Sequence, residues 1–208
     1  MAVQPKMPDQ NPIAEELFSS LKPFKSAMPF DDGQVWDAFR EGDEAAFIFI
    51  YETYFAKLYA YGFRIAADAC LVEDSIQELF IDLRNNRSRL KETDSIKFYL
   101  FSCLKRKLHR EASKWLYKRE GLDSHAYFGF TLSHEQFLID RQMDEADLFR
   151  LNQAIEKLSP RKKEMIYYFF YEGLDYSQIQ ELMGLENIKS ARNLLYKALD
   201  FLRGSLGV

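Results

Sequence analysis

The sequence has little cysteine and little histidine, and it lacks the short motifs of common catalytic and metal sites. It holds 2 Cys and 3 His in 208 residues, with no CxxC pair and no histidines at metal-ligand spacing. It also has no glycine-rich phosphate loop, no GxSxG motif and no inward pair of helical ExxH motifs. We therefore predict a protein that is not an enzyme and has no metal site and no cofactor. Cys70 and Cys103 fall among apolar residues, and we expect both to pack in the core of a protein from a reducing compartment.

Long hydrophobic runs are also missing. No stretch of about 18 apolar residues occurs, which argues against a membrane-spanning helix. The first residues lack the apolar segment of a signal peptide. We expect a cytoplasmic protein without a membrane partner.

The sequence does contain ample apolar material and an uneven distribution of charge. Apolar residues make up 47% of the chain, with 18 Phe and 12 Tyr, so the chain has enough apolar surface to bury a core. The net charge of −4 gives no overall positive field toward nucleic acid. Residues 84–119, however, hold 12 Lys or Arg against 3 acidic residues. This segment is a basic block in an acidic chain.

The apolar periodicity is helical after residue 30. Five of the six prolines lie within residues 1–30, which we treat as a flexible N-terminal extension. Asp43 is a credible N-cap for the first of three amphipathic helices, which together predict one bundle over residues 31–118. The apolar residues that recur at spacings of three and four are Phe47, Tyr51, Tyr54, Phe55, Leu58, Tyr61 and Ile65 in the first helix, Val72, Ile76, Leu79, Phe80 and Leu83 in the second, and Ile96, Leu100, Cys103, Leu104, Leu108 and Trp115 in the third.

The C-terminal part predicts a second domain. Residues 119–147 lose the helical regularity and predict a linker with a short helix near residues 135–147. A helix over about 148–158 begins a domain that covers residues 148–208. Ser159 is an N-cap followed by proline, and it opens a helix that we expect to end at Gly173. The predicted fold class is all-α, with two small helical domains joined by a linker.

This second domain contains the pattern of a helix-turn-helix. Asp175 and Gln178 are a capping-box-like start for a short helix that reaches Met183. Gly184 supplies a turn, and a last helix runs over about 187–203. A short helix, a glycine turn and a longer helix together are typical of a helix-turn-helix.

Two helical faces carry residues suited to nucleic acid. In the last helix, the apolar face holds Ile188, Ala191, Leu195, Ala198, Leu199 and Leu202, and the polar face holds Lys189, Arg192, Asn193 and Tyr196. Arg and Asn side chains can read guanine and adenine in a major groove, and Lys and Tyr reach phosphates. In the third helix, a row with the spacing of a phosphate track holds Lys107, Arg110, Lys114 and Lys118. Either face also fits an ordinary solvated surface.

Aromatic residues of the third helix offer a further possibility, stacking on unpaired bases. The candidates are Phe98, Tyr99, Phe101 and Trp115. Aromatic side chains on a helix more often belong to the core, which is the alternative interpretation.

Together these residues resemble the extracytoplasmic-function (ECF) group of bacterial sigma factors over about residues 36–203. Residues 41–47 (EGDEAAF), with the tyrosines that follow, resemble the opening helix of the first conserved domain of the family. Residues 74–80 (DSIQELF) resemble its DxxQExF helix, the most specific motif in the chain. Residues 158–161 (LSPR), 172–176 (EGLDY) and 184–185 (GL) resemble its second conserved domain.

The resemblance implies a role for each of these segments. The DxxQExF-like helix would dock on RNA polymerase core, through Asp74, Gln77, Glu78 and Phe80. The polar loop over residues 88–95 and the next helix would bind the minus-ten element and a base flipped from the melted non-template strand; the candidate residues are Arg87, Arg89, Lys97, Lys107, Arg110 and Lys114. The last helix would read double-stranded DNA at the minus-thirty-five element through Asn187, Lys189, Ser190, Arg192, Asn193 and Tyr196. The spacing after Gly184 differs by one residue from the commoner one, which leaves the register of the base-reading side chains open.

The leading hypothesis is a sigma factor that directs promoter recognition and transcription initiation, with an anti-sigma protein as a possible further partner. One alternative is a free-standing helix-turn-helix regulator whose first domain senses a ligand or dimerises. Another is a helical protein-interaction module without a DNA contact.

Overall fold

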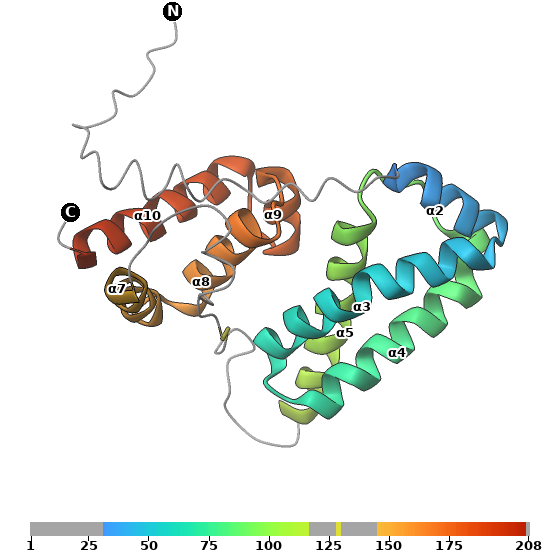
Figure 1. Cartoon of the computed structure of the whole chain (residues 1–208), viewed down its shortest axis with the longest axis horizontal. Coiled ribbons are helices and arrows are strands. Elements are labelled where there is room, and N and C mark those ends of the chain that lie inside the picture. Colours follow the sequence, from blue (N-terminus) through green and yellow to red (C-terminus); the bar gives the residue numbers. More distant parts are fainter. Residues whose placement is uncertain (1–30, 117–127, 130–144, 207–208) are drawn as a thin grey trace, which may run out of the picture. The chain divides into compact units, whose positions relative to one another are not determined.

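The computed structural model describes residues 31–116, 128–129 and 145–206, which belong to two compact units (Figure 1). The first unit contains the described residues up to Gly129, and the second contains those from Glu145 onward. Within these ranges every regular element is a helix, so the all-α prediction is confirmed. The predicted N-terminal extension and most of the predicted linker lie outside the described residues.

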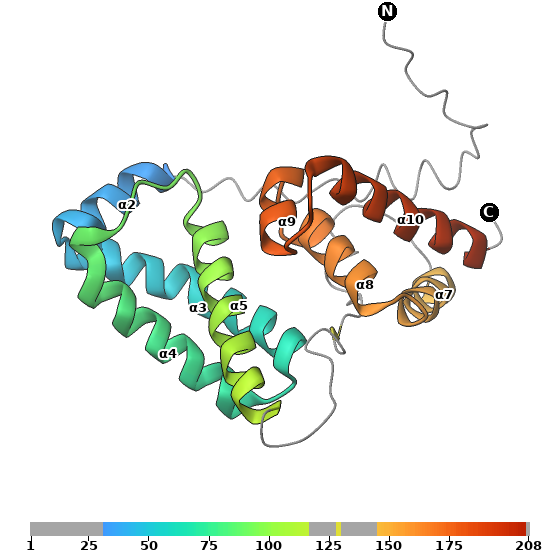
Figure 2. The ribbon, with the colours of Figure 1, turned by 180° about the vertical axis from the view of Figure 1, so that it is seen from behind.

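The first unit is a helical bundle. Its elements are α2 (Asp32–Glu41), α3 (Glu44–Ala66), α4 (Ala69–Asn86), the short 3₁₀ helix η1 (Arg87–Arg89) and α5 (Ile96–Leu116). Helices α3, α4 and α5 pack against one another, and α2 lies at one end of the bundle in both views (Figures 1 and 2). Helix α2 was not predicted from the sequence.

Short local signals define where these helices begin. Asp31 caps α2, and the Asp43 carboxylate accepts from the amides of Ala45 and Ala46 at 2.7 and 3.4 Å, as predicted for the start of α3. Between the two helices, Gly42 has φ +102°, a backbone conformation in which a side chain would be strained. An aspartate before a helix and a glycine after it are the two signals by which α2 could have been found.

Most of the predicted buried face is buried. All five apolar residues expected in α4 are in the core, as are Tyr54, Leu58 and Tyr61 of α3. At Gly62, an added Cβ would lie only 2.8 Å from Val72 Cγ1. The absent side chain therefore lets α3 approach α4 closely.

Two expectations for the core of the first unit are wrong. Cys70 is exposed, because it lies in the first turn of α4 and on the side away from Val72 and Ile76. Tyr51 is also exposed, although its ring packs against Phe80 at 4.8 Å between centroids. In contrast, Phe101 is fully buried and stacks on Tyr61 at 4.4 Å. A core ring cannot also stack on a DNA base.

Two residues of the predicted linker belong to the first unit. Phe128 is buried, and the Gly129 amide donates to the Arg64 carbonyl at 3.0 Å. The Arg64 guanidinium donates back to the Gly129 carbonyl at 3.2 Å. This reciprocal pair of hydrogen bonds ties residues 128–129 to the end of α3.

The second unit consists of α7 (Glu145–Glu156), α8 (Pro160–Ile166), a π-helical turn η2 (Tyr167–Tyr171), α9 (Tyr176–Leu182) and α10 (Ile188–Leu206). Ser159 precedes α8 with Pro160 in its first turn, as predicted. The helix continues through η2 and ends before Gly173, and the widened turn at the aromatic run was not expected. Helix α10 packs on α7, α8 and α9 through Ala191, Leu195, Ala198 and Leu202.

Candidate nucleic-acid interface

The DxxQExF-like segment presents one polar edge of α4. Asp74, Gln77 and Glu78 are exposed, whereas Ile76 and Phe80 are buried. Phe80 is only 4% exposed, and its ring packs against Phe47 and Tyr51. Phe80 therefore supports this edge from inside the bundle, and only the polar residues of the motif reach the surface.

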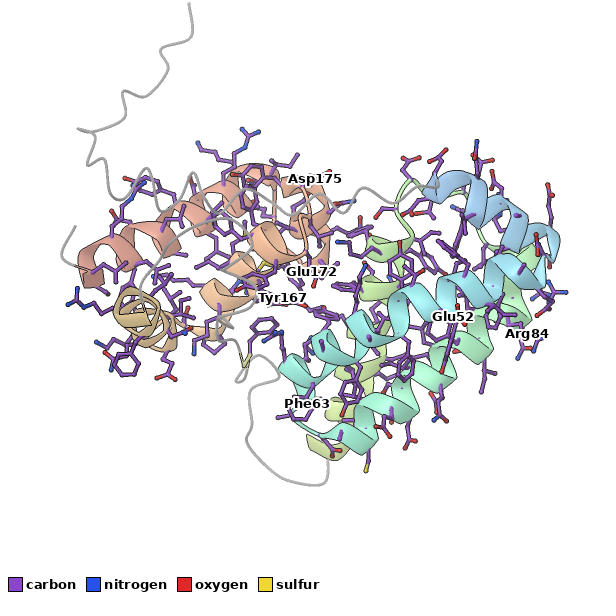
Figure 3. All side chains as sticks on the ribbon, in the orientation of Figure 1. Glu52, Phe63, Arg84, Tyr167, Glu172 and Asp175 are labelled. Atoms are coloured by element: carbon purple, nitrogen blue, oxygen red, sulfur yellow. The ribbon has the colours of Figure 1, made fainter. Side chains whose placement is uncertain are left out.

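Apolar side chains extend the same edge of α4, and they were not predicted as site residues. The Arg84 guanidinium pairs with Glu44 at 2.9 Å, which brings one side of α4 next to one side of α3; Figure 3 labels Arg84 there. Ile48 lies one turn after Glu44, and Ile81 lies one turn before Arg84. Both isoleucines are more than half exposed, at 53% and 59%. In the sequence, the signal for this apolar surface was an isoleucine that follows or precedes a charged residue by one helical turn.

Lys107 of α5 is engaged by α4. Its Nζ lies 2.7 Å from Asp82 Oδ2 and 3.3 Å from Glu78 Oε2, and its side chain is only 14% exposed. Burial lowers the pKa of Lys107, but the hydrogen bonds and charges of Asp82 and Glu78 together outweigh it and raise the pKa above its ordinary value. The spacing placed Lys107 in a phosphate row, whereas the structure surrounds it with carboxylates.

Of the other three residues in that row, the structure describes only the side chain of Arg110. Arg110 is exposed, with Nε 3.6 Å from Glu111 Oε1. The side chain of Lys114 and the whole of Lys118 lie outside the described residues. A continuous phosphate track along α5 therefore stays a prediction.

The polar loop over residues 90–95 is held by α2. Trp36 Nε1 donates to the Lys91 carbonyl at 2.8 Å, and Arg40 Nε donates to the Leu90 carbonyl at 2.8 Å. At the other end of the loop, the Ile96 amide donates to Asp32 Oδ2 at 2.9 Å. Within the loop, the Ser95 amide donates to Thr93 Oγ1 at 3.3 Å. The loop connects η1 to α5 in a defined conformation.

The candidate cations around this loop differ in their accessibility. Arg89 is exposed, and Lys97 in the first turn of α5 is partly exposed. Arg87 is partly buried, and its guanidinium lies against Gly42, where an added Cβ would be 3.6 Å from Nε. Arg89 is therefore the most accessible of the three predicted contacts.

Tyr99 packs against Trp36, the residue that donates to the Lys91 carbonyl of the loop. Its ring is 4.9 Å from that of Trp36. Burial, followed by the neighbouring Cys103, raises the pKa of Tyr99 to about 12, although Arg106 opposes the shift. The hydroxyl therefore stays protonated at neutral pH, and the ring supports Trp36.

In the second unit, α9 and α10 form the predicted helix-turn-helix. The Asp175 carboxylate accepts from the Ser177 and Gln178 amides at 2.8 and 2.9 Å, and Gln178 Oε1 accepts from the Asp175 amide at 3.1 Å. The predicted capping box is therefore present, and Figure 3 labels Asp175 at the start of α9. Gly184 has φ +57° in the turn that follows.

The register of the last helix follows from its own cap. Asn187 Oδ1 accepts from the amide and the hydroxyl of Ser190 at 2.9 and 3.1 Å. The Asn187 oxygen and the Ser190 hydroxyl therefore take part in the cap at the start of α10. Ile188 was expected on the buried face and is 40% exposed, because it lies in the first turn, ahead of Ala191. The exposed polar face begins at Lys189.

That face holds four of the predicted residues together. Lys189, Arg192, Asn193 and Tyr196 are all exposed on α10. The Arg192 guanidinium carbon lies 5.3 Å from the centre of the Tyr176 ring, within the range of a cation–π contact. Burial raises the pKa of Tyr176, and the charge of Arg192 opposes the shift. Tyr176 was not predicted as a site residue, and its place beside Arg192 depends on the tertiary fold.

No group of three or more His, Cys, Asp and Glu side chains among the described residues could hold a metal ion. None of the described helices is long and apolar enough to span a membrane.

Comparisons with known proteins agree with this geometry. Residues 148–202 match the family described as sigma-70, region 4. The fold is similar to that of CnrH, solved in complex with the cytosolic domain of CnrY, with TM-score 0.54, 16% identity, and coverage of 86% of this chain and 98% of that one. It is also similar to the sigma factor RpoE, solved in complex with the anti-sigma factor NepR from Bartonella quintana, with TM-score 0.50, 17% identity, and coverage of 79% and 96%. No curated protein matches the chain by sequence.

Proposed function

We propose that this chain is a sigma factor of the ECF type. In this proposal the first unit binds RNA polymerase core and the minus-ten element. The second unit reads the minus-thirty-five element. The observation that carries the proposal is the coincidence of the region 4 match with the exposed polar face of α10. The match covers residues 148–202, and this stretch contains Lys189, Arg192, Asn193 and Tyr196. The protein itself performs no catalysis in this proposal, and it acts in the cytoplasm with the polymerase.

The polymerase-docking surface in this proposal is the edge of α4 together with the adjoining side of α3. Gln77 lies one turn before Ile81, and Ile48 and Tyr51 add exposed apolar area beside them. An apolar centre with a rim of polar and charged side chains is the usual composition of a protein interface. This surface is suited to a protein partner, because it offers carboxylates and apolar groups instead of an unpaired row of cations.

The second unit is suited to duplex DNA. The exposed face of α10 offers a guanidinium and an amide, which can each form two hydrogen bonds to a base edge. A lysine and a tyrosine on the same face can reach phosphates. In this proposal Asn187 and Ser190 position the first turn of α10, because their polar groups already bond each other.

The minus-ten contact in this proposal combines the loop over residues 90–95 with the cations near it. Arg89 is exposed at one end of the loop, and Arg110 is exposed farther along α5. The net charge of −4 fits a subunit that binds DNA mainly within the polymerase holoenzyme. We propose an anti-sigma protein as a further partner, since the RpoE structure contains one.

In vitro transcription tests the proposal directly. The purified chain is added to sigma-free bacterial core polymerase on a library of genomic fragments, and new start sites are mapped. We expect discrete starts that share two motifs separated by a fixed spacer. An absence of starts, combined with palindromic binding by the protein alone, would instead support a free-standing regulator.

A further inference from the structure

Three side chains on one face of α2 form hydrogen bonds with the backbone at the two ends of the loop over residues 90–95. Asp32, Trp36 and Arg40 are spaced by four residues, so they line one side of the helix. Arg40 and Trp36 donate to the Leu90 and Lys91 carbonyls, and Asp32 accepts from the Ile96 amide, with all three distances between 2.8 and 2.9 Å. Helix α2 thus fixes the point where the loop begins and the point where it ends.

The donors are themselves held in place. Trp36 is fully buried and is packed between Phe39 and Tyr99. Arg40 uses Nη1 for Asp37 at 2.8 Å, which leaves Nε directed at Leu90. A donor that is already fixed loses little conformational entropy when it makes its hydrogen bond.

These hydrogen bonds use backbone groups at the two ends of the loop, and most of its polar side chains remain exposed to solvent. Lys91, Glu92 and Asp94 are exposed, whereas Thr93 and Ser95 are turned partly inward and bond each other. A six-residue segment without regular structure would otherwise sample many conformations, and each ordered residue opposes binding by an entropic term. A loop that is already ordered avoids that term when it meets a ligand.

We propose that α2 pre-orders the loop for capture of the flipped minus-ten base, and that Asp32, Trp36 and Arg40 are positioning residues for this step. The inference rests on the proposed function, because it takes the loop as the surface that meets the melted strand. The three residues act through the loop backbone and need not touch DNA.

Two substitutions at Arg40 separate the hydrogen bond from the charge. Arg40→Met keeps the aliphatic stem and loses both the donor and the charge. Arg40→Gln also loses the charge, but its amide nitrogen follows the Cδ atom, as Nε does in arginine, and can still donate to the Leu90 carbonyl. The pair therefore differs mainly in the bond that the proposal invokes.

The experiment uses the full chain bound to sigma-free core polymerase. The probe is a fluorescent single-stranded oligonucleotide that carries the minus-ten non-template sequence of a promoter mapped with the wild-type protein, and its affinity is measured by anisotropy. For Arg40→Met we expect an affinity about tenfold lower, and for Arg40→Gln a loss of no more than about threefold. Affinity for core polymerase should stay within about twofold of wild type for both variants.

Hydrogen exchange in the free protein gives a readout independent of DNA. The Ser95 and Ile96 amides donate to side chains of Thr93 and Asp32, so loosening of the loop should make both exchange several-fold faster in Arg40→Met. Faster exchange with unchanged oligonucleotide affinity would overturn the proposal, as would a Gln variant as weak as the Met variant. A wild-type holoenzyme that fails to bind the oligonucleotide would instead refute the proposed function itself.

Discussion

Lys107 in the first unit and Arg192 in the second were both identified as DNA contacts by the same argument of helical spacing, and their surroundings are opposite. Lys107 is nearly buried between Glu78 and Asp82 of the neighbouring helix. Arg192 is exposed and lies over the ring of Tyr176. Spacing along one helix identifies the side chains that share a face. The helix packed alongside determines whether a cation on that face is available to a phosphate.

The two units therefore differ in the kind of partner that these surfaces suit, which is protein in one case and DNA in the other. In the first unit, the carboxylates around Lys107 adjoin the exposed edge of α4. In the second unit, an aromatic ring supports a guanidinium beside exposed polar side chains. Four predictions test this division, in order of the size of the expected effect.

The largest effect is expected at the edge of α4. The double substitution Gln77→Lys with Glu78→Lys should weaken binding to core polymerase by about a hundredfold, because it reverses the charge at the centre of the proposed docking surface. The free energy of unfolding should fall by no more than about 1 kcal/mol, since both residues are exposed and the Glu78 pair with Lys107 is the ion pair that the substitution removes. Fluorescence titration against core measures the affinity. Glu156→Lys makes a similar charge change on an exposed residue of the second unit and should bind normally; a double variant that still copurifies with polymerase would contradict the docking surface.

On the DNA side, Arg192→Ala should weaken binding to the minus-thirty-five duplex by about 1 to 3 kcal/mol and relax the preference at one base pair. Lys189→Ala should weaken binding to all sequences about equally and reduce the salt slope by about one. Binding titrations on single-base variants at several salt concentrations measure both quantities. If neither substitution alters promoter activity while the protein stays folded, the module without a DNA contact becomes the better interpretation.

A smaller effect is expected at Lys107, and it concerns stability. Lys107→Met should lower the free energy of unfolding by about 0.5 to 1 kcal/mol, since its two partners are themselves largely exposed. Because the pKa of Lys107 is raised above 10.5 in the folded state, this stabilisation is fully present below pH 10.5 and is lost as the pH rises through the folded pKa. Urea unfolding at pH 8 and above pH 10.5 measures it. A difference between wild type and variant that grows at high pH would contradict the ion-pair assignment.

The smallest effect is expected at Tyr176. Tyr176→Leu should weaken duplex binding by about twofold to fivefold, because the ring that supports the Arg192 guanidinium is lost. Tyr176→Phe keeps the ring and is the matched control, so it should bind within about 1.5-fold of wild type. Equal losses in the two variants would show that the hydroxyl, and not the ring, makes the contribution. Both affinities come from the same titration as for Arg192.

The features that were correctly predicted are those encoded over a few residues. The Asp175 and Gln178 capping box, the turn at Gly184 and the buried stripe of α4 each depend on neighbours within about one helical turn. Such signals are local, so the helix-turn-helix could be predicted nearly residue by residue.

The features that were missed depend on contacts between distant segments. Lys107 is neutralised by residues 25 and 29 positions earlier in the chain. Helix α2 has only two buried residues, Trp36 and Phe39, too few for a periodic signal. Its contacts with the loop join segments separated by 50 to 64 residues. Periodicity within one helix contains no information about such pairs.

The bond between Asp32 and the Ile96 amide has a consequence for how the first unit folds. The first turn of α5 has a local cap, in which Ser95 Oγ accepts from the Phe98 amide at 3.2 Å, and a second cap that closes a loop of 64 residues. During synthesis the Asp32 carboxylate leaves the ribosome long before its partner, so this cap forms only after α3 and α4 have emerged. Non-local contacts of this kind tend to form late in folding. Removal of the carboxylate should therefore accelerate unfolding more than it slows folding, and the lifetime of the native bundle depends on a residue at its very beginning.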